Sequence, residues 1–496
     1  MSRPAPRAVG ALLVLPALLA GCFAPGADAP AEGEQRLALA LAFPPVAALS
    51  PFSDDAVLVT RMGVGETLVG LDEAGDPTPQ LAESWARVDD RTVTLDLRAG
   101  VQFHDGTPLD AEAAAGALTA AAAASPAPRS IDGLGLTARA VDEDTVEVQL
   151  AEPDPLLLQR LAAPGLVVLA PAAYGDPAAP DPVGTGTGPF ELTELRGASG
   201  ATLTADADHW GGAPELDGVD VTFPADAAAR TAGLRAGELD VAVNLPIAQL
   251  PTLTDTEVLS VPLPRLVSLS LDTADGPFAD PGLRAAAVAA IDPQPVVDGV
   301  YEGRADVAEG LFNDDTAGGA DRPAVALPPA SDPAGASIRL ATYSDRAELP
   351  EAAAVLAEQL RQAGFAVEVV VAEYATLETD LLAGTYDAVL ASRLYLGDTG
   401  DPVGYLAADL TCAGSYNLAR LCDPAVDAAV AAAADVADPQ ERRAAALRAE
   451  AAVLSTGAVV PVLHERTHTG YAPSVGGLAT DPFDRLLLTA ETTVGE

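Results

Sequence analysis

Lysine is absent from the 496-residue chain, so all 27 basic side chains are arginines. They face 72 aspartates and glutamates, which leaves a formal net charge of −45 at pH 7. Walker-type phosphate loops and Schiff-base or pyridoxal phosphate chemistry use a lysine, so these functions are excluded. Nucleic acids are held by clustered basic side chains. An acidic chain of this kind is therefore not expected to bind nucleic acid.

Cysteine, aromatic residues and long apolar runs are also scarce. The chain has 3 cysteines, and aromatic residues make up only 4% of it. After the first 20 residues no second long apolar run follows, so nothing else is expected to span a bilayer. The hydrophobic content of 49% is nevertheless that of a globular protein. The length is sufficient for two or three domains with a sizeable core.

The N-terminus carries a sorting signal. Arg3 and Arg7 precede the apolar run 8–20, and residues 19–22 read LAGC. This order of charged, apolar and small residues is typical of a secretory signal peptide. Cys22 resembles the lipidated cysteine of a bacterial lipobox, which predicts a mature protein that begins at Cys22 on a lipid tether outside the cell. The alternative is an ordinary signal peptide with a chance cysteine. Residues 22–36 are rich in Ala, Pro, Gly and Glu and predict a flexible linker.

Cys412 and Cys422 remain as a pair. In an oxidising compartment such a pair favours a disulfide. Closing this short loop would stabilise the fold by about 3 kcal/mol through loop entropy. The alternative is two free thiols.

Strand and helix patterns are interleaved along the chain, which predicts an α/β fold. A strand over 337–343, a helix over 350–363 and a strand over 366–371 form a β-α-β unit, so a partly parallel sheet is expected. Asp280 and Asp438 are predicted N-caps, each followed by a proline, and Glu441 completes a capping box for a helix that ends near Gly457. Further strands are expected at 37–43, 92–97, 100–103, 145–150 and 388–391, and further helices at 111–124 and 282–291.

Residues 464–468 read HERTH and match the HExxH zinc motif, with His464 and His468 as ligands and Glu465 as base. The preceding segment, 457–463, is β-branched and contains a proline, so it predicts a strand. On a strand the two histidines would lie about 13 Å apart, too far for one metal ion. A secreted zinc hydrolase therefore remains the minor alternative, and no metal site is predicted.

Two further segments are candidates for phosphate binding and for catalysis. Residues 184–188 could cradle a phosphate, but Pro189 removes an amide there, so a bend is predicted. Residues 103–108, with His104 beside Asp105, predict a turn rather than a catalytic pair.

Charged residues follow two predicted strands. Arg346 comes shortly after the strand 337–343, and Asp398 follows the strand 388–391 on a loop. An arginine there could bind a ligand carboxylate through two hydrogen bonds, and a carboxylate suits an ammonium group. The carboxyl ends of such strands are where α/β folds bind ligands. Asp401, just before Pro402, is predicted to be an N-cap.

Several ordered motifs resemble those of the family 5 extracellular solute-binding proteins of ABC importers, the peptide and nickel group. The resemblance runs from about residue 37 nearly to the C-terminus. The segments that carry it are 81–85 (LAESW), 101–109 (VQFHDGTPL), 186–190 (GTGPF), 209–217 (HWGGAPELD) and 234–240 (LRAGELD).

Within that family the loop 397–402 (GDTGDP), with Tyr416, Asn417 and the two later cysteines, is similar to the dipeptide-binding branch. The resemblance implies that Asp398 binds the peptide ammonium and that Arg346 binds the carboxylate. Tyr395, Arg393, Tyr416 and Asn417 complete the candidate ligand-binding set. Tyr395 stands where relatives carry a tryptophan, and Glu348 stands where an aromatic residue is expected after the arginine.

The resemblance implies a two-lobed type 2 periplasmic-binding fold, not an enzyme, with no cofactor. Lobe I would comprise residues 37–65, 185–270 and 471–496. An inserted subdomain would comprise residues 66–184, and lobe II would comprise residues 271–470. Two crossing strands would act as a hinge. A monomer of this kind would capture a short peptide or similar zwitterion and deliver it to the permease subunits of an ABC transporter. A nickel chelate, an oligosaccharide or a siderophore is the alternative ligand.

Overall fold

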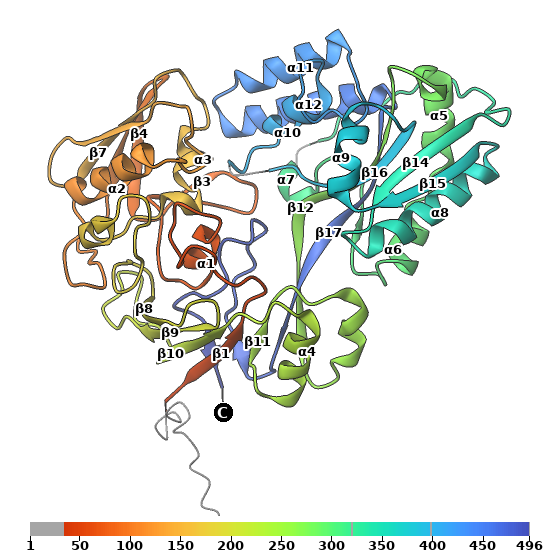
Figure 1. The fold of residues 1–496 in the computed structure, drawn as a ribbon. Helices are drawn as coiled ribbons and strands as arrows, with labels where there is room; N and C mark the ends of the chain where they lie inside the picture. Colours follow the sequence, from red (N-terminus) through yellow and green to blue (C-terminus); the bar gives the residue numbers. More distant parts are fainter. Residues whose placement is uncertain (1–33, 319–320, 397–398, 496) are drawn as a thin grey trace, which may run out of the picture. The chain divides into compact units, whose positions relative to one another are not determined.

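One long mixed β-sheet runs through the computed structural model, which describes residues 34–318, 321–396 and 399–495. Figure 1 shows helices packed around both ends of this sheet. Residues Gln35–Glu496 form one compact unit. In spatial order the strands are β15 (Ala366–Ala372), β14 (Ser337–Tyr343), β16 (Ala388–Leu394), β12 (Glu257–Leu271), β17 (Val459–Tyr471), β11 (Val241–Ala242), β1 (Arg36–Ala40), β10 (Gly218–Thr222), β9 (Gly200–Ala205) and β8 (Phe190–Leu195).

The predicted β-α-β unit is confirmed. Strands β14 and β15 pair in parallel, with α8 (Glu348–Gln362) connecting them, and β16 is parallel to β14 on its other side. The apolar side of α8, including Leu349, Leu356 and Leu360, is fully buried in the same cluster as the strands. This arrangement places the carboxyl ends of β14 and β16 next to each other.

The other end of the sheet is organised around the first strand. Strand β1 pairs in parallel with β10 and β11, and the antiparallel strands β9 and β8 follow. The expectation of a strand from residue 37 is confirmed, but β1 ends at Ala40 rather than at Phe43. The Leu41 N–H still bonds the Thr222 carbonyl, and Pro44 and Pro45, which follow Phe43, have no backbone N–H to continue a ladder.

Two strands join these two ends. Strands β12 and β17, of 15 and 13 residues, pair antiparallel over most of their length (Figure 1). The strand predicted for 457–463 is confirmed, and it continues through the HERTH segment. The β12–β17 register shifts between Pro262 and Leu266, so residues 263–265 form an irregular stretch of β12.

A second, four-stranded sheet has the order β4 (Ala82–Asp89), β5 (Thr92–Leu97), β7 (Thr145–Gln149) and β6 (Thr137–Ala140), with α2 (Ala111–Ala123) packed on it. The strand predicted over 100–103 is wrong. Only one isolated bridge, between Gln102 and Pro108, forms there. The chain instead makes the predicted tight turn, in which Gly106 has a φ of +81° and the Phe103 N–H bonds the Thr107 carbonyl.

Helix starts follow the predicted caps in two cases and depart from them in a third. The Asp280 carboxylate accepts from the Gly282 N–H at the start of α5 (Pro281–Ala290), and the Asp438 carboxylate accepts from the Glu441 N–H at the start of α12 (Pro439–Ser455). The prediction for Asp401 is wrong. Its carboxylate forms two bonds of 2.8 Å to the buried Arg442 guanidinium, and no side-chain cap is made at α10 (Val403–Leu410).

The other elements complete the two ends of the sheet and the surrounding loops. They are α1 (Ala56–Arg61), β2 (Val69–Leu71), β3 (Pro77–Pro79), α3 (Leu157–Leu161), α4 (Ala227–Ala236), α6 (Gln294–Gly299), β13 (Asp306–Val307), α7 (Asp314–Ala317), α9 (Tyr374–Leu382), α11 (Pro424–Ala434), β18 (Val475–Gly476) and β19 (Thr493–Val494). No helix among the described residues is long and apolar enough to cross a membrane.

The disulfide supplies the first testable prediction. Cys412 and Cys422 are bonded across a sequence separation of 10. We expect the double variant C412S/C422S to lose about 3 kcal/mol of unfolding free energy, because the open loop gains entropy in the unfolded chain. Guanidinium denaturation of the two proteins measures the difference. A variant as stable as the wild type would contradict the entropic role.

Candidate ligand-binding site

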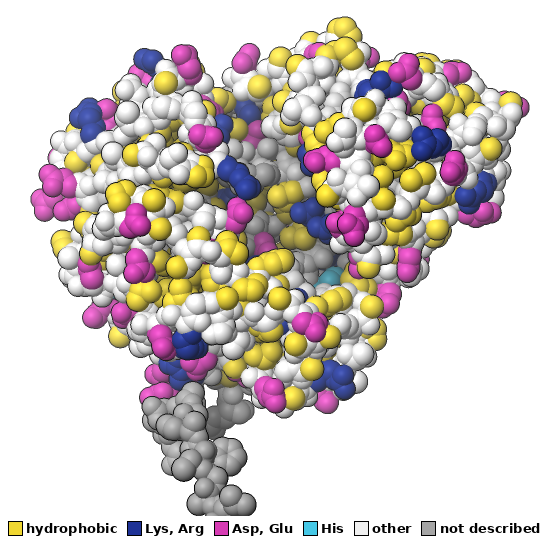
Figure 2. Space-filling view, in the orientation of Figure 1, with side chains coloured by type: hydrophobic (Ala, Val, Ile, Leu, Met, Phe, Trp, Pro, Cys, Tyr) yellow, Lys and Arg dark blue, Asp and Glu magenta, His cyan; other side chains and the backbone are white. Residues whose placement is uncertain are grey.

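A pocket of about 490 Å³ opens beside the two long strands β12 and β17. Figure 2 shows the hollowed face of the molecule, with basic and apolar side chains on its walls. Its lining comes from segments far apart in the sequence. They are Phe43, Val57, Asn244, Leu245, Pro246, Ile247, Leu263, Pro264, Arg265, Tyr301, Arg346, Glu348, Leu394, Glu465, Arg466, Thr467, His468, Pro482, Phe483 and Asp484.

Arg346 reaches this pocket from the loop between β14 and α8. One terminal nitrogen, Nη1, lies 3.3 Å from each oxygen of the Glu465 carboxylate. The Arg346 side chain is 38% exposed. An arginine has five N–H donors, so most of the donors on this guanidinium are not engaged by Glu465. The predicted position of Arg346, just past a strand that ends at the sheet edge, is what brings it to the pocket.

Glu465 is the buried centre of a charged cluster. The Ser392 hydroxyl donates to its Oε2 at 2.7 Å, and the Tyr301 hydroxyl lies 3.4 Å from Oε1. Arg265 approaches more loosely, with Nε 3.8 Å from Oε2. Burial raises the pKa of Tyr301, and the Glu465 charge raises it further, so the phenol stays protonated and can donate. The carboxylate is thus held by side chains from four separate segments.

Arg265 lines the pocket from β12. It lies where the β12–β17 register shifts, an irregularity of the kind found where side chains are re-aimed, while its pairing with Leu394 of β16 is kept. Burial lowers the pKa of the Arg265 guanidinium, and the positive charge of Arg346 lowers it further. The group is thus a buried cation beside a second cation.

Arg393 and Tyr416 form a separate unit. The Arg393 guanidinium makes two hydrogen bonds, of 2.7 and 2.9 Å, to Asp409, and it lies 3.7 Å from the centre of the Tyr416 ring. The Tyr416 hydroxyl is 2.6 Å from that of Tyr374. Burial raises the pKa of Asp409, against the lowering effect of Arg393.

Tyr395 and Asn417 have local structural partners. Tyr395 is 1% exposed, and its hydroxyl accepts from the Asn313 N–H at 3.0 Å. The Asn417 side chain donates to the carbonyls of Thr411 and Leu421 and accepts from the Leu421 N–H, which ties together the loop closed by the disulfide. These bonds engage the polar groups of both residues within the fold.

The predicted ligand-binding residues therefore do not all lie at the pocket. Among those in the described ranges, Arg346 alone lines the pocket, while Arg393, Tyr395, Tyr416 and Asn417 do not. Asp398 and Cys22 lie outside the described residues. Ligand binding by the candidate set stays a prediction.

Sequence reasoning missed Arg265, Tyr301 and Asn244. Only the segment around Asn244 offered a signal, because asparagine tolerates the left-handed backbone found there (φ +52°). The Arg230 guanidinium donates to the carbonyls of Val243 and Asn244, which fixes this loop at the pocket edge.

The HERTH segment has the geometry expected of a strand. His468 contacts the Ser260 hydroxyl through Nδ1 at 2.9 Å, and His464 packs edge-on against Tyr395. Glu465 is engaged with Arg346 and Ser392. Within residues 34–318, 321–396 and 399–495, no group of three His, Cys, Asp or Glu side chains is arranged to hold a metal ion.

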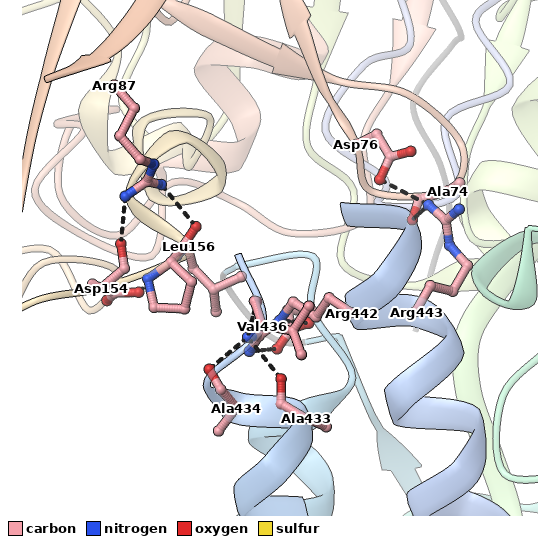
Figure 3. A network of polar contacts seen from close by, with 12 residues as sticks. Ala74, Asp76, Arg87, Asp154, Leu156, Ala433, Ala434, Val436, Arg442 and Arg443 are labelled. Carbon is pink, nitrogen blue, oxygen red and sulfur yellow. Dashed lines mark hydrogen bonds and ion pairs between the residues drawn. The ribbon is translucent and has the colours of Figure 1, made fainter. Parts of the chain in front are cut away.

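A second polar network joins the turn before β3 to α12. The Arg443 Nη2 donates to the Asp76 carboxylate at 2.7 Å and approaches the Ala74 carbonyl (Figure 3). Gly75 lies so close to Gly400 that a Cβ would stand 2.6 Å from the Gly400 carbonyl oxygen. Residues 74–76 and the start of α12 are thereby held together.

The family model for bacterial extracellular solute-binding proteins, family 5 middle region, matches residues 76–417. A dipeptide-binding protein of Pseudomonas aeruginosa is 26% identical over 459 residues, which cover 82% of this chain and 85% of that protein. The glutathione-binding protein GsiB of Escherichia coli is 31% identical over 254 residues, about half of each chain.

Solved structures match over more of the length. The crystal structure of a nickel ABC transporter protein from Bacillus halodurans has a TM-score of 0.81 and 25% identity, and the match covers 93% of this chain and 100% of that one. A dipeptide-binding protein from Pseudoalteromonas in complex with Met-Leu has a TM-score of 0.68 and 22% identity, with the same coverage. The expected two-lobed periplasmic-binding fold is confirmed.

The two buried histidines of β17 predict a pH dependence of stability. Burial lowers the pKa of both His464 and His468 to about 4. Between about pH 6.5 and pH 4 the unfolded chain then binds more protons than the folded one, so the unfolding free energy falls as the pH falls. We expect H464Q to reduce this slope by up to about 1.4 kcal/mol per pH unit.

Guanidinium denaturation at pH 7.5, 5.5 and 4.5 measures both slopes. At pH 7.5 the histidine is neutral in both states, so that value serves as the reference for each protein. An unchanged slope in H464Q would contradict the prediction.

Proposed function

Because the chain belongs to the family 5 bacterial extracellular solute-binding proteins, we propose that it is a lipid-anchored receptor that captures a short peptide or similar zwitterion. Homologues are substrate-binding proteins of ABC transporters, not enzymes. Proteins of this family serve ABC importers of peptides or nickel chelates. The identity of the ligand, the lipid anchor and the monomeric state belong to the proposal.

The observation that carries the proposal is Arg346 in the 490 Å³ pocket. Its guanidinium lies at the carboxyl end of β14. Only Nη1 contacts Glu465, so the other N–H donors are available to a ligand. A ligand carboxylate would complete those bonds. Asp398 comes four residues after β16, the parallel neighbour of β14. We assign to Asp398 the ligand ammonium, at the same edge of the sheet.

The mode of capture follows from the proposed division of the chain. Lobe I would comprise 37–65, 185–270 and 471–496 with the subdomain 66–184, and lobe II would comprise 271–470. Strands β12 and β17 would form the hinge between them, and closure would bury the ligand. The loaded monomer would then dock on the permease subunits of an ABC transporter.

A nickel chelate is the second candidate ligand. The nickel transporter protein of Bacillus halodurans is similar over 93% of this chain. Metal chelates often carry free carboxylates, which Arg346 could bind in the same way as a peptide terminus. A chelate would not require the ammonium contact at Asp398, and this difference separates the two candidates.

A thermal-shift screen tests the ligand. The fragment from residue 23 onward, which lacks Cys22 and keeps β1 complete, is mixed with di- to pentapeptides, nickel chelates and oligosaccharides. A ligand at 100 times its Kd adds about 2.7 kcal/mol of stability, which is readily measured. We expect a peptide to raise Tm and its N-acetylated form to have no effect, because acetylation removes the ammonium.

The variant D398N tests the assigned residue. We expect it to weaken peptide binding by about 2–5 kcal/mol, since the ligand ammonium would be left without a carboxylate partner. D132N, at an exposed aspartate, is the matched control and should bind as the wild type does. Unchanged affinity in D398N would refute the ammonium site, and a response to chelates alone would favour the second candidate.

The lipid anchor is tested at Cys22. In the bacterial host, we expect the wild-type protein to partition with membranes and to incorporate labelled fatty acid. C22S removes the thiol that accepts the lipid, so we expect it to carry no label and to leave the membrane fraction or remain unprocessed. Equal labelling of both proteins would contradict the lipobox assignment.

A further inference from the structure

Four of the described arginines differ in how firmly the fold holds them. Arg442 makes two bonds of 2.8 Å to Asp401 and donates to three backbone carbonyls, as Figure 3 shows in part. Arg420 contacts Asp272 at 2.6 and 3.0 Å. These guanidinium groups are fully engaged by the fold and have structural roles.

Arg265 and Arg346 are held loosely by comparison. Arg265 lies 3.8 Å from Glu465 and 3.4 Å from the Ser392 hydroxyl, and Arg346 touches Glu465 at 3.3 Å through a single nitrogen. The Arg265 side chain is 25% exposed and that of Arg346 is 38% exposed. A guanidinium with so few short bonds to the protein has further N–H donors that a ligand could engage.

Glu465 is the carboxylate that the two arginines share. Arg393 is paired with Asp409, and Glu465 forms the ion pairs of both Arg265 and Arg346. Glu348 also lines the pocket, but among the described residues it forms no ion pair with either arginine. The two guanidinium groups therefore have one paired carboxylate between them.

We propose that Arg265 binds the ligand directly and forms, with Arg346, a two-guanidinium seat for an anionic group, so that the ligand class is one with a free carboxylate. The inference rests on the proposed function and narrows its substrate class. Glu465 contacts both guanidinium groups, and all three residues line the 490 Å³ pocket. Neutral oligosaccharides and peptides with an amidated C-terminus lack the carboxylate that this pair of arginines would bind.

The first test is calorimetric binding with R265Q and a pair of probes. The probes are the best-binding peptide of the screen and its C-terminal amide, and citrate with and without nickel(II) extends the set to chelates. We expect R265Q to weaken binding of the free carboxylate at least about 30-fold and to alter binding of the amide by less than about 3-fold. The control R129Q, at an arginine 78% exposed and outside the pocket, should bind both as the wild type does. Equal loss for the two probes, or no loss, overturns the proposal.

The second test needs no ligand. Arg265 has only long contacts to the fold and lies beside the like charge of Arg346, so R265Q should leave the Tm of the unliganded protein equal to or above that of the wild type, whereas R442Q should lower it clearly. A fall in R265Q as large as that in R442Q would show a structural role and overturn the proposal. If the wild type binds none of the probes, the proposed function fails, and this comparison alone decides on Arg265.

Discussion

The antiparallel pairing of β12 with β17 is the constraint on which the rest of the structure depends. These strands are the only part of the described sheet that connects the β14–β16 end to the β1–β11 end. They also carry Arg265 and Glu465, two of the charged side chains of the pocket. A group bound there contacts the connecting strands themselves, so ligand binding and the geometry of the connection are physically coupled.

The absence of lysine gives the arginines a double role. A guanidinium has several donors in a fixed plane, so it can bind backbone carbonyls and carboxylates at once. Arg230 and Arg284 each donate to carbonyls of adjacent segments and so fasten loops to the sheet. Against this background Arg265 and Arg346 differ, because the fold leaves part of their hydrogen-bonding capacity unused.

Local patterns predicted much of the fold. The caps Asp280 and Asp438 were correct because each rests on a hydrogen bond to an N–H two or three residues away. The strand 337–343 was correct because its own residue pattern carries the signal, although its ladder partners are in β15 and β16. Asp401 was wrong because its partner, Arg442, is 41 residues away. No local rule reports a long-range ion pair that competes with a cap. The strand expected at 100–103 failed for a related reason, since a turn bond from Phe103 to Thr107 replaced a ladder.

The candidate site was predictable only in part, and for a physical reason. Arg346 could be found because it follows a parallel strand, and the end of such a strand is a site that topology alone defines. Arg265 lies at a register shift between β12 and β17, which depends on how the partner strand is paired. The periodicity of the sequence does not reveal such an irregularity. The second guanidinium of the pocket was therefore not predicted.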